Sequence, residues 1–220
     1  MAQQSLKDPK EKQLKKKPVE MFIETITITQ EPLGDEGRSP EELEVIERLF
    51  YLGQSKPKKA IDELLAAIEK YPHIPQFYQN LFVIYYHCRE QKKYIEWVDK
   101  TRERFPDYLF AKCAYAQLQM RKGLFEAVPE IFNKKFSLKS LYPERSVFHF
   151  TELIAHAQCM ARYFCGIRDF KMAKIYVEMM RPFDPEGTSL EDLEITILIG
   201  ERTEKLFTSL MRNDLKRKSV

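Results

Sequence analysis

The chain has 220 residues, of which 44% are hydrophobic and 12% aromatic, so it is long and apolar enough for one domain with a substantial core. Its net charge of +3 comes from its two ends, because residues 1–17 carry +4 and residues 211–220 carry +3, which leaves −4 on residues 18–210. An acidic body disfavours nucleic acid as the main ligand, since phosphate-binding domains concentrate lysine and arginine on the folded surface.

The numbers and positions of glycine, proline and cysteine indicate which fold class and which cellular compartment to expect. Seven glycines against 12 prolines, most of them between periodic segments, predict long helices joined by short turns, and hence an all-α fold. The sequence has no apolar run of 18 residues and no signal-peptide core, so we expect a cytoplasmic protein without a membrane span. The four cysteines have no CxxC spacing and are expected to be reduced core residues.

Residues 1–38 form a predicted amino-terminal tail. Its first 20 residues lack apolar periodicity and should be solvated. Residues 21–30 instead alternate like a β-strand, with Phe22, Glu24, Ile26 and Ile28 on one face. A helical protein offers such a strand no obvious ladder partner. We therefore expect the segment to dock in an extended form on the chain's own helices or on a second copy, to avoid an exposed apolar edge.

The first two helices have clear sequence signals. Ser39 is placed to cap a helix with Pro40 in its first turn and Glu42 completing a capping box. This helix should run from Pro40 to Gly53 and turn inward the apolar residues Leu43, Ile46, Leu49 and Phe50. The next helix, Ala60–Lys70, has one apolar stripe, and the small residues Ala60 and Ala67 should allow a neighbouring helix to approach closely.

The frame of residues 60–72, which closes at Pro72, returns 34 residues later and closes at Pro106. In the second unit Tyr78, Leu81, Phe82 and Tyr85 precede Tyr94 and Val98 at the spacing of the tetratricopeptide repeat. A third match joins Ala157, Met160, Ala161 and Phe164 to Ala173, Val177 and Pro185. The chain therefore resembles the tetratricopeptide repeat family. This resemblance implies a helical-repeat solenoid of about four helix pairs plus a terminal capping helix, within residues 39–212, followed by a basic tail over residues 213–220.

The match has departures. Phe82 and Tyr94 are bulky where the family prefers small residues, so their helix pair must be splayed or compensated by small neighbours. Residues 133–145 are an insertion of about 11 residues beyond the 34-residue period. We expect this insertion to fold back over the helices that it joins, because Phe136, Leu138 and Tyr142 are too apolar for a free loop.

In such arrays the first helix of each pair lines the concave face, so the resemblance points to residues that would touch a ligand. The lysines and asparagines with which one subset of the family clamps chaperone tails are absent, which favours an apolar or mixed segment of another protein with modest acidic character. The predicted partner-binding residues are Gln79, Val83, Tyr86, His87, Cys113, Gln117, Met120, Arg121, Gln158 and Arg162.

No motif predicts catalysis, a metal site or a cofactor. His149, Glu152, His156 and Cys159 fall near one face of a helix, but no matching ligands come from other segments, so a polar helix face is the favoured interpretation. We therefore expect a non-catalytic protein-interaction module or adaptor. A chaperone for a hydrophobic client segment and a helical-repeat RNA binder are the alternatives, and a homo-oligomer stays open.

Overall fold

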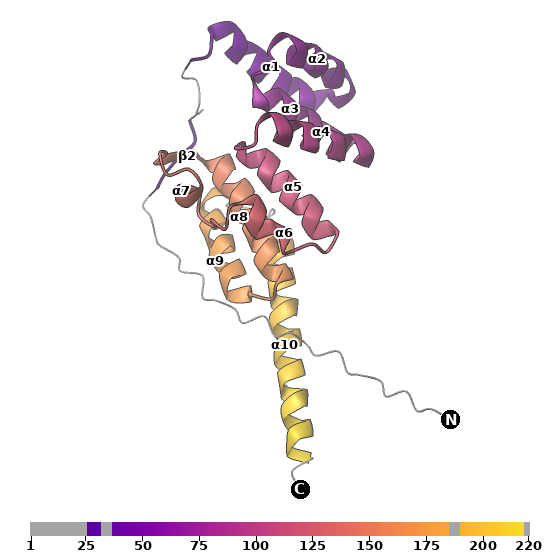
Figure 1. Cartoon of the computed structure of the whole chain (residues 1–220), viewed down its shortest axis with the longest axis vertical. Coiled ribbons are helices and arrows are strands. Elements are labelled where there is room, and N and C mark those ends of the chain that lie inside the picture. Colours follow the sequence, from indigo (N-terminus) through magenta and orange to yellow (C-terminus); the bar gives the residue numbers. More distant parts are fainter. Residues whose placement is uncertain (1–25, 32–36, 185–189, 218–220) are drawn as a thin grey trace, which may run out of the picture.

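The computed structural model describes residues 26–31, 37–184 and 190–217, with side chains as far as Ser209, and this part is almost wholly helical (Figure 1). The predicted all-α class is confirmed at this level. In chain order the elements are β1 (Thr27–Thr29), α1 (Pro40–Ser55), α2 (Pro57–Lys70), α3 (Pro75–His87), α4 (Gln91–Arg104), α5 (Leu109–Arg121), α6 (Ala127–Ile131), α7 (Leu138–Leu141), β2 (Val147–His149), α8 (Phe150–Gly166), α9 (Phe170–Met180), a 3₁₀-helix (Arg181–Phe183) and α10 (Glu191–Arg217).

Each helix packs chiefly on its neighbours in the chain. The pairs α1–α2, α3–α4, α5–α6 and α8–α9 are in direct contact, and α2–α3, α4–α5 and α5–α8 join one pair to the next. Local signals set the helix starts. The predicted capping box is present, with Ser39 accepting from the backbone N–H of Glu42, and Asp169 caps α9 by accepting from Met172. Proline opens α1, α2 and α3, where its missing N–H costs nothing.

Two hydrophobic clusters form the interior. The first joins α1–α4 and contains Ala60 and Ala67, so the prediction that these small residues lie at helix contacts is confirmed. The second joins β2 and α6–α10. Helix α5 belongs to both, because Ala114 and Leu118 pack into the first cluster whereas Leu109 and Ala116 pack into the second. The two clusters thus meet on opposite sides of one helix.

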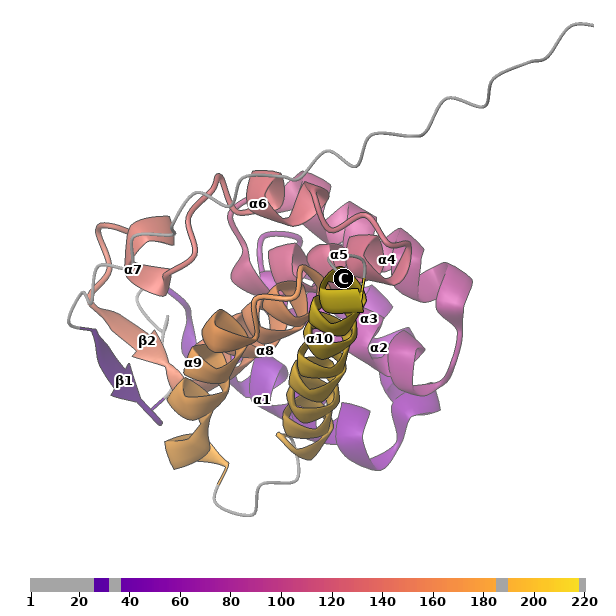
Figure 2. The same ribbon diagram turned by 90° about the horizontal axis from the view of Figure 1, so that it is seen from below.

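The strand-like segment has a partner within the chain, contrary to the expectation that the helical body offers none. Thr27–Thr29 pairs in parallel with Val147–His149, with Ile28 opposite Phe148. Figure 2 shows the two strands side by side at the edge of the molecule. Ile26 and Ile28 pack on the second cluster, and β1 also contacts α8. The extended docking on the chain's own body is confirmed for these residues, while residues 21–25 lie outside the described part.

The insertion before α8 folds back as predicted. Leu138 is buried in the second cluster, and Phe136 stacks on Tyr163 with ring centroids 6.0 Å apart. The hydroxyl of Tyr142 donates to the carbonyl of Asp107 at 2.7 Å, which ties the insertion to the start of α5. The strand β2 follows directly after the insertion, and β1 pairs with it there.

Two predictions about the ends of the fold are wrong. Phe50 does not face inward, because its position on α1 leaves it 47% exposed while Leu49 is fully buried. The carboxyl-terminal helix does not stop near residue 212 but continues to Arg217, so most of the predicted basic tail is helical. In Figure 1 this helix, α10, projects well beyond the body. No helix among the described residues is both long and apolar enough to span a membrane.

Candidate functional site

One side of α3 carries an open stripe of predicted binding residues. Gln79, Val83, Tyr86 and His87 follow each other at helical spacing, so they share one side of the helix. Val83 is 37% and Tyr86 44% exposed, unusual values for large apolar side chains on a helix whose other sides are buried. The stripe therefore presents apolar surface and a phenol to solvent.

The two bulky residues at positions where the resembled family prefers small ones determine how Tyr86 is placed. Phe82 and Tyr94 are both buried and meet edge to face, with ring centroids 6.2 Å apart, while α3 and α4 still pack directly on each other. Tyr94 in turn lies 5.3 Å from Tyr86, centroid to centroid. Because Tyr94 fills the space beneath it, the ring of Tyr86 stays at the surface.

Arg121, at the end of α5, completes this cluster. Its Nη2 donates to the Tyr86 hydroxyl at 3.2 Å, and its guanidinium lies 5.2 Å from the centre of the Tyr86 ring. Burial raises the pKa of Tyr94, and the nearby positive charge of Arg121 opposes that rise. Arg121 is exposed and makes no ion pair with a carboxylate among the described residues. Its charge is thus available to an anionic group on a ligand.

Helices α3 and α5 are linked by side chains at both ends. Near their amino termini the Tyr108 hydroxyl donates to the Gln79 amide oxygen, and near their carboxyl termini Arg121 reaches Tyr86. Between these links α4 contacts both helices, and α3 and α5 do not pack closely on each other. Gln117, four residues before Arg121, lies on the same side of α5 and is partly exposed.

Cys113 and Met120 do not lie where the prediction placed them. Cys113 is 3% exposed, and its carbonyl oxygen lies 3.8 Å from the Sγ of Cys159, which donates to it across the α5–α8 contact. Met120 is partly buried against the second cluster. The prediction that Cys113 touches a ligand is wrong, because its side of α5 is covered by α8.

The predicted residues of α8 form a separate part of the surface. Arg162 is exposed and Gln158 partly exposed, four residues apart on one side of the helix. Among the described residues, no hydrogen bond, ion pair or ring contact joins them to Tyr86 or Arg121, although α8 packs on α5. The structure therefore brings Tyr86 and Arg121 together, with Gln79 two turns away on the same side of α3 and Arg162 as a second exposed cation on α8.

The histidine-containing face of α8 has structural roles. His149 caps the helix by accepting from the Thr151 backbone N–H at 3.4 Å, and Glu152 binds the His149 N–H at 3.0 Å and pairs with Arg145 at 2.7 Å. His156 is 1% exposed between Phe132 and Tyr176, and burial lowers its pKa to about 4. Within the described residues, no group of three or more histidine, cysteine or carboxylate side chains could hold a metal ion.

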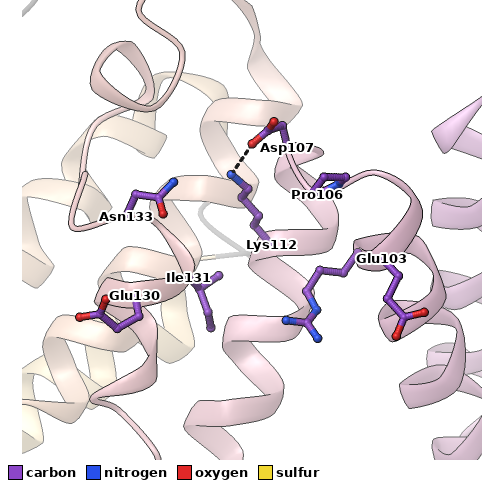
Figure 3. A pocket seen from close by; sticks show the side chains of 8 residues that line it. Glu103, Pro106, Asp107, Lys112, Glu130, Ile131 and Asn133 are labelled. Atoms are coloured by element: carbon purple, nitrogen blue, oxygen red, sulfur yellow. Dashed lines mark hydrogen bonds and ion pairs between the residues drawn. The ribbon is translucent and has the colours of Figure 1, made fainter.

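A pocket of about 470 Å³ lies on another side of α5, between α4 and α6. Figure 3 shows Lys112 pointing to Asp107, with which it forms an ion pair of 3.0 Å. The guanidinium of Arg102 is stacked 3.8 Å from the centre of the Tyr115 ring. Three carboxylates surround these two cations, so the lining offers no net positive charge to an anion. The residues that line it are Arg102, Glu103, Pro106, Asp107, Lys112, Glu130, Ile131 and Asn133.

Comparisons with protein-family models, with curated proteins and with solved structures return no match for this chain. The site is therefore described by its own geometry: an exposed tyrosine, a guanidinium above it and an apolar neighbour. The sequence missed two residues that support it, Tyr94 and Tyr108. Tyr94 was noticed only as a departure from the repeat pattern, and Tyr108 precedes its helix, where periodicity gives no signal.

Proposed function

We propose that this chain is a non-catalytic protein-interaction module built as an irregular tetratricopeptide-like array. It binds a segment of another protein on the side of the array that carries Tyr86 and Arg121. The repeated spacing closing at Pro72, Pro106 and Pro185 supports the array, and so does the order in which each helix pair contacts the next.

The observation that carries the proposal is the contact between Arg121 and Tyr86. A guanidinium without a carboxylate partner among the described residues lies above an exposed phenol, beside an exposed valine. Tyrosine and arginine are enriched at protein interfaces because each combines apolar surface with hydrogen bonding. The cluster fits a segment with one carboxylate for Arg121 and one apolar side chain against Val83 and Tyr86, three or four residues apart if the segment is helical.

A displayed library of random peptides, selected on the purified full chain, tests this proposal. We expect the selected peptides to share an aspartate or glutamate close to an apolar residue. For a synthetic consensus peptide, Arg121→Gln should weaken binding by about tenfold or more, as should Tyr86→Ala. Lys122→Gln is the matched control, since Lys122 is exposed and adjacent in sequence but on another side of the helix end.

The outcomes separate the alternatives. Peptides without a shared carboxylate, or binding that Arg121→Gln leaves unchanged, would contradict the proposed site. A salt titration adds a second criterion, because one or two ion pairs give a shallow dependence whereas an RNA binder loses affinity steeply with salt. Selection of purely apolar peptides that bind equally to the Arg121→Gln variant would instead favour the chaperone alternative.

A further inference from the structure

Helix α10 has a second apolar side that the body does not cover. Its inner side, with Leu193 and Ile197, is buried against α8 and α9. Five other large apolar residues of α10 are about half to two-thirds exposed. They are Ile195 (47%), Leu198 (49%), Ile199 (59%), Leu206 (66%) and Phe207 (64%).

Four of these residues, Ile195, Leu198, Ile199 and Leu206, form one continuous surface, which we call the α10 stripe. Positions 195, 199 and 206 recur at four and seven residues, so they lie above one another along the helix, with Leu198 beside them. Phe207 lies about a quarter-turn further round the helix, toward the side that packs on the body in the first turns. Among the described side chains, the last one that bonds to the body is Glu201, paired with Lys174 at 2.8 Å. The remaining 16 residues of the helix, about 24 Å long, project beyond it (Figure 1).

The charges along α10 are ordered from one sign to the other. Its first turn contains Glu191, Asp192 and Glu194. Of the three, Glu194 already pairs with Arg181 of the same chain at 2.6 Å. The last turns of the helix contain Arg212, Lys216 and Arg217 against one acid, Asp214, and residues 211–220 together carry +3. Two copies of α10 laid side by side in opposite directions bring each acidic end against a basic end, whereas parallel copies bring like charges together.

We propose that the α10 stripe is the interface of a homodimer in which two α10 helices pack antiparallel. A twofold axis requires a surface that is complementary to itself, and this helix meets the requirement because its apolar stripe faces its own copy while its charge order reverses. Antiparallel packing also sets the two helix dipoles in opposition. The dimer goes beyond the proposed peptide binding, since it would carry two Tyr86–Arg121 clusters on one assembly.

Sedimentation velocity of the full chain between about 1 and 100 µM tests the interface. We expect dimers with a dissociation constant on the order of 10 µM or below, and Leu206→Glu should raise it by about tenfold or more. Thr208→Glu is the matched control, because it adds the same charge at the same depth on the opposite side of the helix, and it should leave the dimer intact. A wild-type chain that is monomeric throughout, or a dimer that both variants leave unchanged, would overturn the proposal.

Charge reversal tests the direction of packing. The variant Glu191→Lys/Asp192→Lys and the variant Lys216→Glu/Arg217→Glu should each dimerise at least about tenfold more weakly than the wild type at low salt. Mixed in equal amounts, the two variants should recover dimers, because the reversed end of each matches an end of the other. Failure of the mixture to associate more strongly than either variant alone would overturn the antiparallel arrangement. Far-UV circular dichroism checks that each variant stays helical.

Discussion

The two halves of this molecule bury the apolar sides of their helices with different kinds of element. In the first half, α1–α4 follow a regular order, and nearly every buried residue lies on a periodic stripe. In the second half, an insertion, a strand pair and a long terminal helix complete the core around α8 and α9. Helix α5 contributes to both interiors. In this chain, regularly spaced helices bury one another in the first half. In the second half, irregular segments complete the core where that regular spacing is interrupted.

The largest effect is expected from Phe148 in the second half. Its side chain is fully buried beneath the strand pair, so Phe148→Ala should lower the free energy of unfolding by about 3–5 kcal/mol. Val147→Ala, at an exposed neighbouring position, should cost less than about 1 kcal/mol. Urea titrations can be followed by circular dichroism for the whole chain and by fluorescence of Trp97, the single tryptophan, for the first half.

The same experiment also tests whether the two halves unfold together, because the urea midpoints measured by Trp97 fluorescence and by circular dichroism can be compared. Because α5 packs into both clusters, we expect the Phe148→Ala variant to shift the Trp97 signal and the circular dichroism together. If Trp97 keeps the wild-type midpoint while the dichroism shifts, the two halves unfold independently, and the coupling through α5 is wrong.

A smaller loss is expected from overpacking the first half. Ala67 is 7% exposed at the contact of α2 with its neighbours, and Ala67→Leu should cost about 1–3 kcal/mol because the added atoms have no space. Ala66→Leu, one position away on the exposed side of α2, is the control and should have little effect. An unchanged urea midpoint for Ala67→Leu would show that α2 is not closely packed.

Acid should act on the second half through His156. Its pKa is lowered to about 4 in the folded chain, against about 6.5 when unfolded, so the unfolded chain binds the proton first as the pH falls. The contribution of the neutral His156 to the free energy of unfolding is therefore fully present above the unfolded pKa, and it declines as the pH drops toward 4. Between pH 7 and 5.5 this group should remove about 1 kcal/mol.

The variant His156→Phe isolates that contribution. It places an aromatic ring between Phe132 and Tyr176 without a titrating group. The difference in unfolding free energy between pH 7 and 5.5 should be smaller in this variant than in the wild type by about 1 kcal/mol. Equal pH dependence in both proteins would mean that His156 is not buried in the neutral form.

The smallest effect concerns the contact between α5 and α8. The hydrogen-bonding contact with the Cys159 side chain, together with burial, raises the pKa of the Cys113 thiol, and Cys159 is fully buried, so both should resist iodoacetamide in the native protein. Half-buried Cys88, in the first half, should be alkylated first, as measured by mass spectrometry. Labelling of Cys113 as fast as Cys88 would show that α8 separates from α5 in solution.

The sequence was informative where short-range patterns determine structure. The Ser39 capping box and the apolar stripe of α2 both follow from spacing within one helix. The exposure of other residues depends on contacts between helices. Phe50 is exposed and Cys113 is covered because of how neighbouring helices lie, which one helix's periodicity does not reveal.

The α10 stripe, by contrast, is visible in the sequence as a second apolar periodicity. The expectation of a terminal capping helix did not include this stripe, because one buried side is enough to explain why the segment is helical.

At the candidate site, Tyr86 and Arg121 were each predicted from the repeat spacing, but not as a pair. Their contact could not be predicted, because it depends on how α4, which packs on both α3 and α5, positions these two helices.

The pairing of β1 with β2 also means that one step of folding must wait until most of the chain has been synthesised. Gln30 and His149, whose carbonyl oxygen and Nε2 lie 3.3 Å apart, are separated by 119 positions. At translation rates of about 5–20 residues per second, β1 is synthesised roughly 6–24 s before its partner strand. The helix pairs of the first half need only neighbouring sequence and can form within that interval. The strand pair is therefore a late step of folding, and until then the amino-terminal segment has no partner strand to which it can add.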